Sequence, residues 1–589
     1  MRQTFKFNLF FVFLACSITS LTSVAQIQNF QATSSVLWSE NVLIPAGGRK
    51  NILNLNPADL EQLIYKGKIH TQIYPIEITG ALPPLRPINN FFENRSSSFF
   101  QIILSTIGKA FTGLNSLDDI LKNLGLHNYP EKTDIGVYSV PYPNEIRPDY
   151  RMGFGIINNH GTQGFTFSCA ACHSSQLFGK TVLGLTNRFP RANDYFLKMK
   201  NLSPVLKPLI GTWVFNQVAG STEPENKMIL NTLNNLERVN VKKPLILGLD
   251  TSLAQVSLSL NKRSDDAWAT PDQFKQIFPS EDIFLDQHPA DSKPAVWWNL
   301  KYKNRWLSDG SVVSGNPIIT NILWNEIGRG TDLKILNTWI KNNLKKIDEL
   351  TAAIFSIEPP RITDFFTETE LNNLNSNSNL STITRLESAK NGEVIFNKTC
   401  AKCHGNYEKK WTEANTENLS YAELTQTTLV TYKPTTKVVD VGTDPNRYLG
   451  MKSLEQLNKL QISKDYAISV IAQKGYVPPP LVGIWSRWPY FHNNSAPNLC
   501  AVLTATNQRP KFYYAGAAND KNTDFDVECN GYPEGDKAPL EWKKDILFYD
   551  TNREGLHNTG HDEGIFLKGG QEILTSQDKK DLIRFLQTL

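Results

Sequence analysis

Apolar residues recur at near-helical spacing over several long stretches of this chain. The pattern predicts helices over residues 203–218 and 226–239, and a helical pair or one long helix over 317–355. A further helix is expected over 99–124. Pro359-Pro360 cannot continue a helix, so the 317–355 stretch should end before this pair.

Polar residues interrupt this pattern over residues 368–384, where Asn and Ser form a low-complexity run. Such a run is typical of a linker, and we place a domain boundary at about residue 375. Beyond it, residues 386–400 are expected to form a helix. Near the end of the chain, Thr575–Asp578 has a capping-box pattern, which predicts a closing amphipathic helix that runs to Leu589.

The start of the chain has the pattern of a secretory signal. Arg2 and Lys6 supply positive charge, Leu9–Ala15 is an apolar run, and small residues ending at Ala25 form a cleavage site. No later apolar run reaches the roughly 20 residues that a membrane span needs. We therefore expect residues 1–25 to be removed and the mature protein to be periplasmic or secreted, with no membrane span.

Composition changes this picture little. Hydrophobic residues make up 40% of the chain and charged residues 20%, as in ordinary globular proteins. Loss of Arg2 and Lys6 with the signal would lower the formal charge from +4 to +2. This near-neutral balance gives no reason to expect nucleic acid as a partner.

Two Cys-x-x-Cys-His motifs carry the strongest chemical signal. Cys169, Cys172 and His173 form one motif, and Cys400, Cys403 and His404 the other. This motif attaches haem c: the thiols form thioethers with the porphyrin, and the histidine ligates the iron. A shared zinc site is disfavoured, because 228 positions separate Cys172 from Cys400 and a histidine follows each pair. A thioredoxin-like motif would not need the histidines.

Three cysteines remain outside these motifs. Cys16 lies in the expected signal, and lipidation there is disfavoured because the preceding residues make a poor lipobox. Cys500 and Cys529 are left in an exported chain, where a disulfide is expected. Two unpaired thiols are the alternative.

The second axial position of each haem iron decides its function. His561 lies in a glycine-flanked loop and is the first candidate distal ligand of haem 2, the haem of the Cys400 motif; His492 is the second. Haem 2 is therefore expected to have two histidine ligands. Nothing near Cys169 marks a distal ligand for haem 1, which favours an open, reactive iron there. The alternative is that His70, His127 or His160 caps it in the fold.

The residues of the second half resemble a known family. Four stretches carry the closer resemblance: Gly442-Thr443-Asp444-Pro445, Leu481-Val482-Gly483-Ile484-Trp485, Pro489-Tyr490-Phe491-His492-Asn493 and Asn558-Thr559-Gly560-His561. The two haem motifs resemble the bacterial di-haem cytochrome c peroxidase superfamily, and the four stretches resemble in particular its rubber oxygenase-like branch of long di-haem c-type cytochromes.

The resemblance implies His173 and His404 as proximal ligands and His561 as the distal ligand of haem 2. It also implies that Trp298 matches a tryptophan between the haems. Trp297-Trp298 has a plainer interpretation as core packing. In the rubber-cleaving members haem 1 binds oxygen; in the peroxidases haem 1 takes hydrogen peroxide and haem 2 supplies electrons.

The sequence thus predicts a mainly α protein of two cytochrome c-like helical domains, 26–374 and 375–589, with extensive loops and few short strands. Each domain is expected to carry one covalently bound haem c. The predicted function is an exported haem-dependent oxidoreductase, peroxidase-like or dioxygenase-like. Haem 1 reacts with peroxide or oxygen, and haem 2 passes on electrons from a small redox protein or another donor. The alternative is a non-enzymatic electron-transfer cytochrome with both haems six-coordinate.

Overall fold

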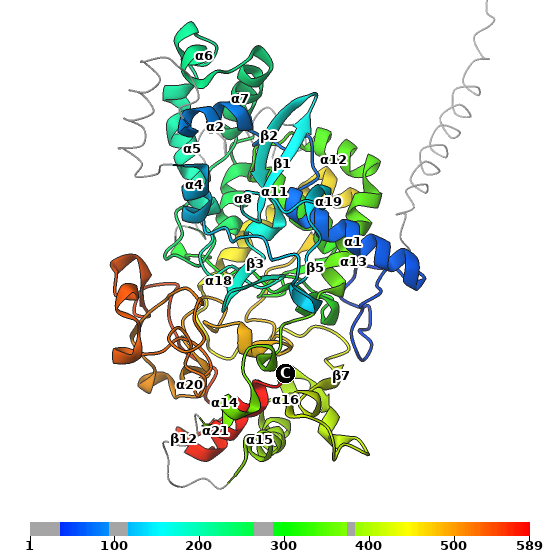
Figure 1. Ribbon diagram of the computed structural model, residues 1–589, viewed down its shortest axis with the longest axis vertical. Coiled ribbons are helices and arrows are strands. Elements are labelled where there is room, and N and C mark those ends of the chain that lie inside the picture. The colour runs from blue at the N-terminus through cyan, green and yellow to red at the C-terminus, as the bar shows by residue number, and fades with distance from the viewer. Residues whose placement is uncertain (1–35, 94–115, 264–284, 286, 374–382) are drawn as a thin grey trace, which may run out of the picture. The chain divides into compact units, whose positions relative to one another are not determined.

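A computed structural model describes residues 36–93, 116–263, 285, 287–373 and 383–589 (Figure 1). The chain groups into two compact units, Met1–Leu37 and Trp38–Leu589. All helices and strands of the described residues belong to the second unit. The predicted signal lies outside the described residues. Among the helices that the structure describes, none is both long enough and apolar enough to cross a bilayer.

The helices of the first half lie before and after the Cys169 motif along the chain. They are α1 (Pro57–Ile73), α2 (Leu85–Glu93), α4 (Leu117–Asn123), α5 (Ala192–Leu206), α6 (Trp213–Ala219), α7 (Glu223–Leu236), α8 (Ser252–Leu260), α11 (Pro317–Ile327), α12 (Leu333–Asn342), α13 (Leu344–Ser356) and α14 (Glu368–Asn373). Several begin at side-chain caps that satisfy the first free backbone N–H groups, such as Asn56 of α1 and Asp332 of α12.

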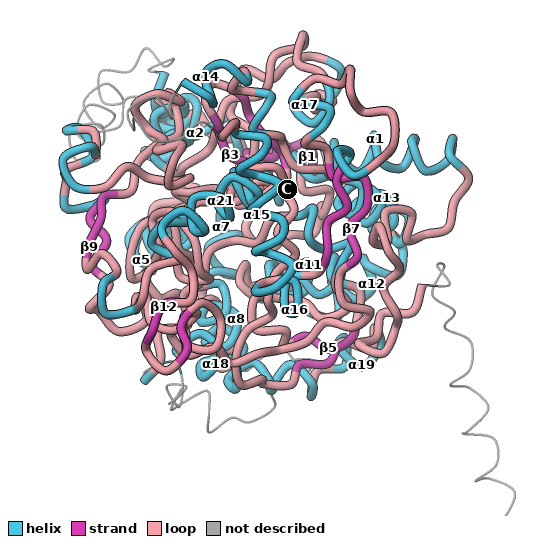
Figure 2. Tube along the Cα trace, turned by 90° about the horizontal axis from the view of Figure 1, so that it is seen from below, coloured by secondary structure: helices cyan, strands magenta, loops and turns pink. Residues whose placement is uncertain are grey.

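Helices of the second half are shorter, except for the two at its ends. They are α15 (Arg385–Thr399), α16 (Ala401–His404), α17 (Tyr421–Leu424), α18 (Asn446–Gly450), α19 (Gln461–Asp465), α20 (Leu499–Val502) and α21 (Ser576–Leu586). In Figures 1 and 2, α15, α16 and α21 gather beside the C-terminus.

The strands form six separate two-stranded antiparallel sheets. The pairs are β1 (Phe154–Asn159) with β2 (Thr162–Phe167), β3 (Ser174–Leu177) with β4 (Lys180–Leu183), β5 (Val312–Ser314) with β8 (Ser469–Val470), β6 (Asn406–Lys409) with β7 (Thr427–Thr431), β9 (Phe512–Tyr514) with β10 (Phe548–Asp550), and β11 (Leu567–Lys568) with β12 (Gln571–Glu572).

The predicted fold class, mainly α with two cytochrome c-like helical domains, is wrong. The structure is 42% helical and 12% strand, with much of the rest in loops. The β5–β8 pair joins residues from both sides of the predicted boundary, and one hydrophobic core runs from Tyr74 to Leu589. Each of these strands is short and has few buried residues. The alternation of apolar and polar residues is therefore too brief to predict them from the sequence. The boundary at 375 itself lies outside the described residues and stays a prediction.

Most of the predicted helices form, with different limits. The 226–239 helix corresponds to α7 and the 203–218 helix to parts of α5 and α6. The 317–355 stretch is divided into α11, α12 and α13, and α13 ends at Ser356, ahead of Pro359-Pro360. Of the 99–124 helix, residues 94–115 lie outside the described residues, and α4 covers its end.

The two long helices of the second half cross where one of them has a glycine. α15 begins with a capping box at Thr384 and α21 with one at Thr575, which confirms both predicted helices. A Cβ on Gly392 of α15 would lie 2.0 Å from the carbonyl oxygen of Asp581 in α21. Only glycine permits this approach. Because α15 leads directly into the Cys400 motif, the crossing fixes where that motif starts.

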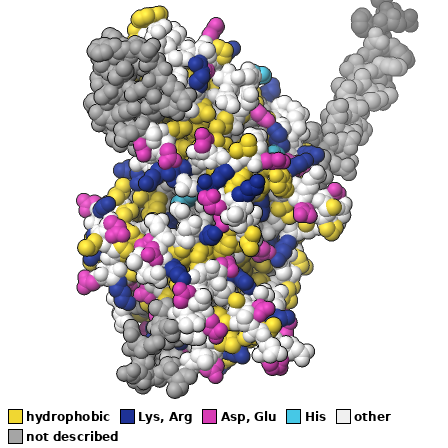
Figure 3. All heavy atoms as spheres, viewed as in Figure 1, with side chains coloured by type: hydrophobic (Ala, Val, Ile, Leu, Met, Phe, Trp, Pro, Cys, Tyr) yellow, Lys and Arg dark blue, Asp and Glu magenta, His cyan; other side chains and the backbone are white. Residues whose placement is uncertain are grey.

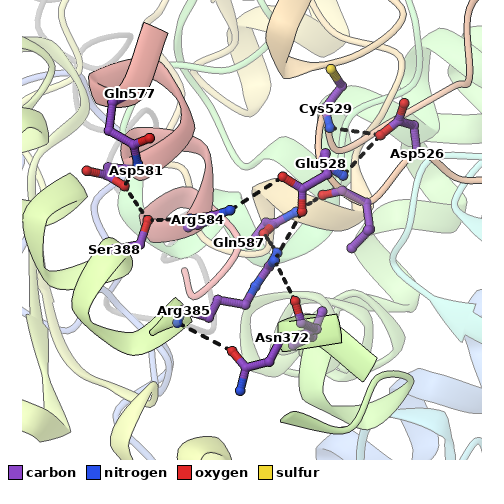
Figure 4. A network of polar contacts seen from close by, with 12 residues as sticks. Asn372, Arg385, Ser388, Asp526, Glu528, Cys529, Gln577, Asp581, Arg584 and Gln587 are labelled. Carbon is purple, nitrogen blue, oxygen red and sulfur yellow. Dashed lines mark hydrogen bonds and ion pairs between the residues drawn. The ribbon is translucent and has the colours of Figure 1, made fainter. Parts of the chain in front are cut away.

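A buried polar network holds the same helices together (Figure 4). Arg385 of α15 donates to the Leu371 carbonyl at 3.1 Å and to Glu528 at 3.4 Å, and it also contacts Gln587. Arg584 of α21 donates to Ser388 at 2.9 Å and pairs with Glu528 at 3.5 Å. The network therefore ties α14, α15, α21 and the loop at Glu528 into one body. Next to that loop, Cys529 is bonded to Cys500, which confirms the expected disulfide.

Candidate haem sites

The first Cys-x-x-Cys-His motif lies between two hairpins. Cys169–Ala171 form a 3-10 turn after β2, and β3 follows at Ser174. The glycine-spaced stretch ahead of the motif forms the β1–β2 hairpin. At Gly153, which has φ +101°, a Cβ would lie 2.6 Å from the Cα of Ala171. This glycine lets the hairpin pack directly against the motif.

The second motif continues a helix. α15 ends at Thr399, and α16 carries Ala401–His404. Gly405 follows with φ +83°, and a Cβ there would meet the carbonyl oxygen of Thr431 at 2.8 Å, so the chain turns sharply into β6. None of the four cysteines of the two motifs is in a disulfide, so all four are available for thioether attachment.

Both motifs line one cavity of about 560 Å³. The cysteines and the histidine of each motif contribute to its wall, as does His561. Much of the remaining wall is apolar, with side chains such as Phe396, Leu481 and Leu582. A cavity with a largely apolar surface that also carries polar and charged side chains suits a large, mostly apolar ligand with a few polar groups.

The proximal histidines are oriented by backbone carbonyls. His173 Nδ1 lies 2.7 Å from the Ala295 carbonyl oxygen, and His404 Nδ1 lies 2.8 Å from that of Pro479. A carbonyl only accepts, so Nδ1 carries the proton and Nε2 is left with its lone pair for a metal. Burial lowers the pKa of His173, and it lowers the pKa of His404 to about 4. Both imidazoles are therefore neutral at neutral pH, which is the form that ligates metals.

His561 faces His404 in the cavity. Their ring centres are 6.2 Å apart. The His561 backbone has φ +57° and donates to the Val441 carbonyl at 2.8 Å. A Cβ on the preceding Gly560 would lie 2.2 Å from the carbonyl carbon of Gly442. Close backbone packing thus holds the loop that the sequence suggested to be flexible.

The separation of the two imidazoles fits a metal between them. Two metal–nitrogen bonds of about 2 Å each, plus roughly 1 Å from each nitrogen to its ring centre, add to about 6 Å. The observed separation is 6.2 Å. Burial also lowers the pKa of His561 to about 3, so this ring is neutral as well. The residues therefore fit a haem iron with two histidine ligands, the porphyrin supplying the other four nitrogens.

No second imidazole faces His173 among the described residues. The ring beside it is Trp297, with centres 5.1 Å apart. His70 pairs with Glu349 at 3.2 Å, and neither it nor His127 nor His160 lines the cavity. His492 does line it, but its ring is stacked on Tyr476 with centres 3.9 Å apart. The two motifs thus differ in what the fold places opposite their histidines.

Trp298 connects the two motifs without lining the cavity. Its side chain is fully buried, and its indole N–H donates to the Val482 carbonyl at 2.8 Å. Three residues earlier, Ala295 accepts from His173; three residues before Val482, Pro479 accepts from His404. These carbonyl acceptors could not be found from the sequence, because any residue type supplies a carbonyl.

The four stretches that carried the family resemblance meet around His404 and His561. Pro479 precedes the 481–485 stretch, and Gly442 of the 442–445 stretch packs against Gly560. Asn493 donates to the Gly555 and His557 carbonyls, just ahead of the 558–561 stretch. This arrangement, with a covalent attachment motif and a second histidine across a cavity, is the one expected of a c-type haem site.

Comparison with known proteins agrees with this class. Residues 475–514 match the family described as RoxA-like, cytochrome c-like. A cytochrome c-like domain implies covalently bound haem c. The match covers Pro479 and the 481–485 and 489–493 stretches, so it falls on the segment that orients His404.

Two curated relatives share parts of the chain, both from Sinorhizobium fredii (strain NBRC 101917 / NGR234). "Uncharacterized protein y4iM" is 31% identical over 126 residues, which cover 20% of this chain and 28% of the relative. "Uncharacterized protein y4iJ" is 25% identical over 249 residues, which cover 34% of this chain and 38% of the relative. The chain thus matches well under half the length of each of these relatives.

Proposed function

We propose that the chain is an exported di-haem c-type cytochrome and a haem-dependent oxidoreductase related to the di-haem peroxidase superfamily. Cys169, Cys172 and His173 would hold haem 1, the site that reacts with peroxide or oxygen. Cys400, Cys403 and His404 would hold haem 2, with His561 as its second axial ligand. Its partners would be a small redox protein or another electron donor, and a small oxidant.

One observation carries this proposal: the difference between the two proximal histidines. His404 has an imidazole across the cavity at 6.2 Å between ring centres, whereas no second imidazole faces His173 among the described residues. A haem with two histidine ligands transfers electrons, while an iron with an open position can bind a small oxidant. The protein's part is to set these two ligand environments.

Trp298 supports electron transfer between the two sites. From His173 a hydrogen bond reaches Ala295, the backbone runs to Trp298, and its indole bonds to Val482 at 2.8 Å. From there the backbone runs back to Pro479, which accepts from His404. Two short backbone segments and three hydrogen bonds thus connect the proximal ligands through one buried tryptophan.

Reoxidation of the reduced protein by hydrogen peroxide tests the proposal. Peroxide takes two electrons and two protons to give two waters, so one equivalent should reoxidise both haems, as followed by their absorption bands. Reduced protein that stays reduced after an equivalent of peroxide, and also in air, would contradict an oxidant site at His173. That result would favour the alternative, an electron carrier with both irons six-coordinate.

A further inference from the structure

The charge inside the cavity is strongly one-sided. Six cationic side chains line it, and Asp250 is the one carboxylate that does so among the described residues. On the outer face shown in Figure 3, by contrast, basic and acidic side chains are interspersed. The six cations are Lys293, Lys303, Arg329, Lys402, Arg447 and Arg487.

Four of these cations have no carboxylate partner in the part of the chain that the structure describes. One of the four, Lys402, lies within the Cys400 motif and donates to the Gly564 carbonyl at 3.0 Å; the other three lie outside both motifs. The Lys293 ammonium donates to the carbonyls of Arg487 and Pro489, and the Arg487 guanidinium donates to the Pro480 carbonyl at 2.9 Å. No described group binds the Lys303 ammonium. Arg329 and Arg447, in contrast, pair with Glu326 and Asp309. We call Lys293, Lys303 and Arg487 the cation triad.

The cation triad lies between the two haem motifs. Lys293 is two residues from Ala295, the carbonyl that orients His173. Arg487 bonds to Pro480, the neighbour of the carbonyl that orients His404. Arg487 also acts electrostatically on both Lys293 and Lys303, so it lies near each of the two lysines. Each is half-buried and lines the cavity.

Grouped cations without a counterion are unfavourable in a protein interior. Burial, and after it the charge of Arg487, lowers the pKa of Lys303 to about 8, and the same causes lower the pKa of Lys293. Asp309 is the one carboxylate that acts favourably on Lys303 among the described residues, and it is shared, because it also pairs with Arg447 at 3.3 Å and accepts from Ser311. Buried cations are normally paired with anions. An anionic group bound in the cavity beside the cation triad would therefore be stabilised.

The structure assigns the cation triad a role: the three side chains form a carboxylate-binding site, between the two haem motifs, for the propionate groups of the porphyrins. This inference rests on the proposed function, because it needs haem in the cavity. The thioether links hold the vinyl edge of each porphyrin at the cysteines, so the carboxylates belong on the other side of the ring. A free inorganic anion has the same charge and is the competing occupant.

The test compares Lys303 with Lys301 in the haem-loaded protein. Lys301 is also buried but lies outside the cavity wall and pairs with Glu358 at 2.8 Å. Lys303→Met should reduce the equilibrium constant for reduction of one haem about tenfold, because a nearby buried cation favours the added electron. It should also shift the propionate modes in resonance Raman spectra. Lys301→Met should leave both unchanged; equal effects of the two variants, or none from Lys303→Met, would overturn the assignment.

The unaltered protein supplies a second test that does not depend on a variant folding. If propionates occupy the cation triad, exchanging chloride for phosphate at constant ionic strength leaves both reduction potentials unchanged. Potentials that follow the identity of the anion would overturn the assignment in favour of a free ion. The haem content distinguishes failure of the proposed function from failure of the propionate site. One haem per chain contradicts the proposed function. Two haems per chain, with no effect of Lys303→Met on reduction or on the propionate modes, contradict only the role of the cation triad.

Discussion

Replacing His561 by alanine should convert haem 2 from six-coordinate to five-coordinate. The imidazole of His561 is the group that faces His404 across the cavity, with ring centres 6.2 Å apart. Its loop is held by backbone contacts at Gly560 and Val441, so removal of the side chain should leave the loop in place. The low-spin electron paramagnetic resonance signal of haem 2 should therefore be lost and a high-spin signal should replace it.

Two controls make this result specific to ligation. Added imidazole should restore the low-spin signal in His561→Ala, because the free ligand can fill the vacated position. His492→Ala should keep the low-spin signal, since the His492 ring is stacked on Tyr476 with centres 3.9 Å apart. A low-spin signal that survives in His561→Ala and is lost in His492→Ala would reverse the ligand assignment.

Replacing Arg385 by alanine should destabilise the second half of the chain by about 1–3 kcal/mol, the cost typical of leaving buried hydrogen-bond partners unpaired. The Arg385 side chain is 2% exposed and bonds to Leu371, Gln587 and Glu528 (Figure 4). Its loss leaves the buried Leu371 carbonyl and Gln587 side chain without this donor, whereas Glu528, 38% exposed, can be solvated by water. Urea unfolding, followed by the haem absorption, should show the lower midpoint.

Arg361 provides the matched control for this measurement. Its side chain is 47% exposed, and its contact with Asp364 is long, at 3.8 Å. Arg361→Ala should change the free energy of unfolding by less than about 1 kcal/mol, as for other surface pairs. A similar loss of stability in the two variants would show that the buried network does not hold α14, α15 and α21 together.

The sequence predicts best where the signal is local. The capping boxes at Thr384 and Thr575 and the apolar spacing behind them identify α15 and α21. The β1–β2 hairpin is not predicted, because a glycine-rich sequence is typical of a loop. In the structure these glycines allow close packing, such as that of Gly153 on Ala171. The division of 317–355 into three helices likewise depends on tertiary packing rather than on periodicity.

Only those parts of the candidate site whose side-chain type is diagnostic can be predicted from the sequence. The Cys-x-x-Cys-His motifs and His561 have chemical identities that the sequence displays. The orienting groups, Ala295 and Pro479, act through carbonyls and have no sequence signature. The cation triad is equally hidden, because lysine and arginine are usually surface residues and only the fold turns these three toward a cavity.

We expect the two haems to differ in coordination: the His173 haem has a free position on its iron, and the His404 haem does not. Carbon monoxide binding to the dithionite-reduced protein measures this directly, because the gas binds only iron that has an open or easily vacated site. We expect one carbon monoxide per chain that carries two haems, bound at the His173 haem and leaving the haem of His404 and His561 unchanged. Binding of none, or of two, would contradict it.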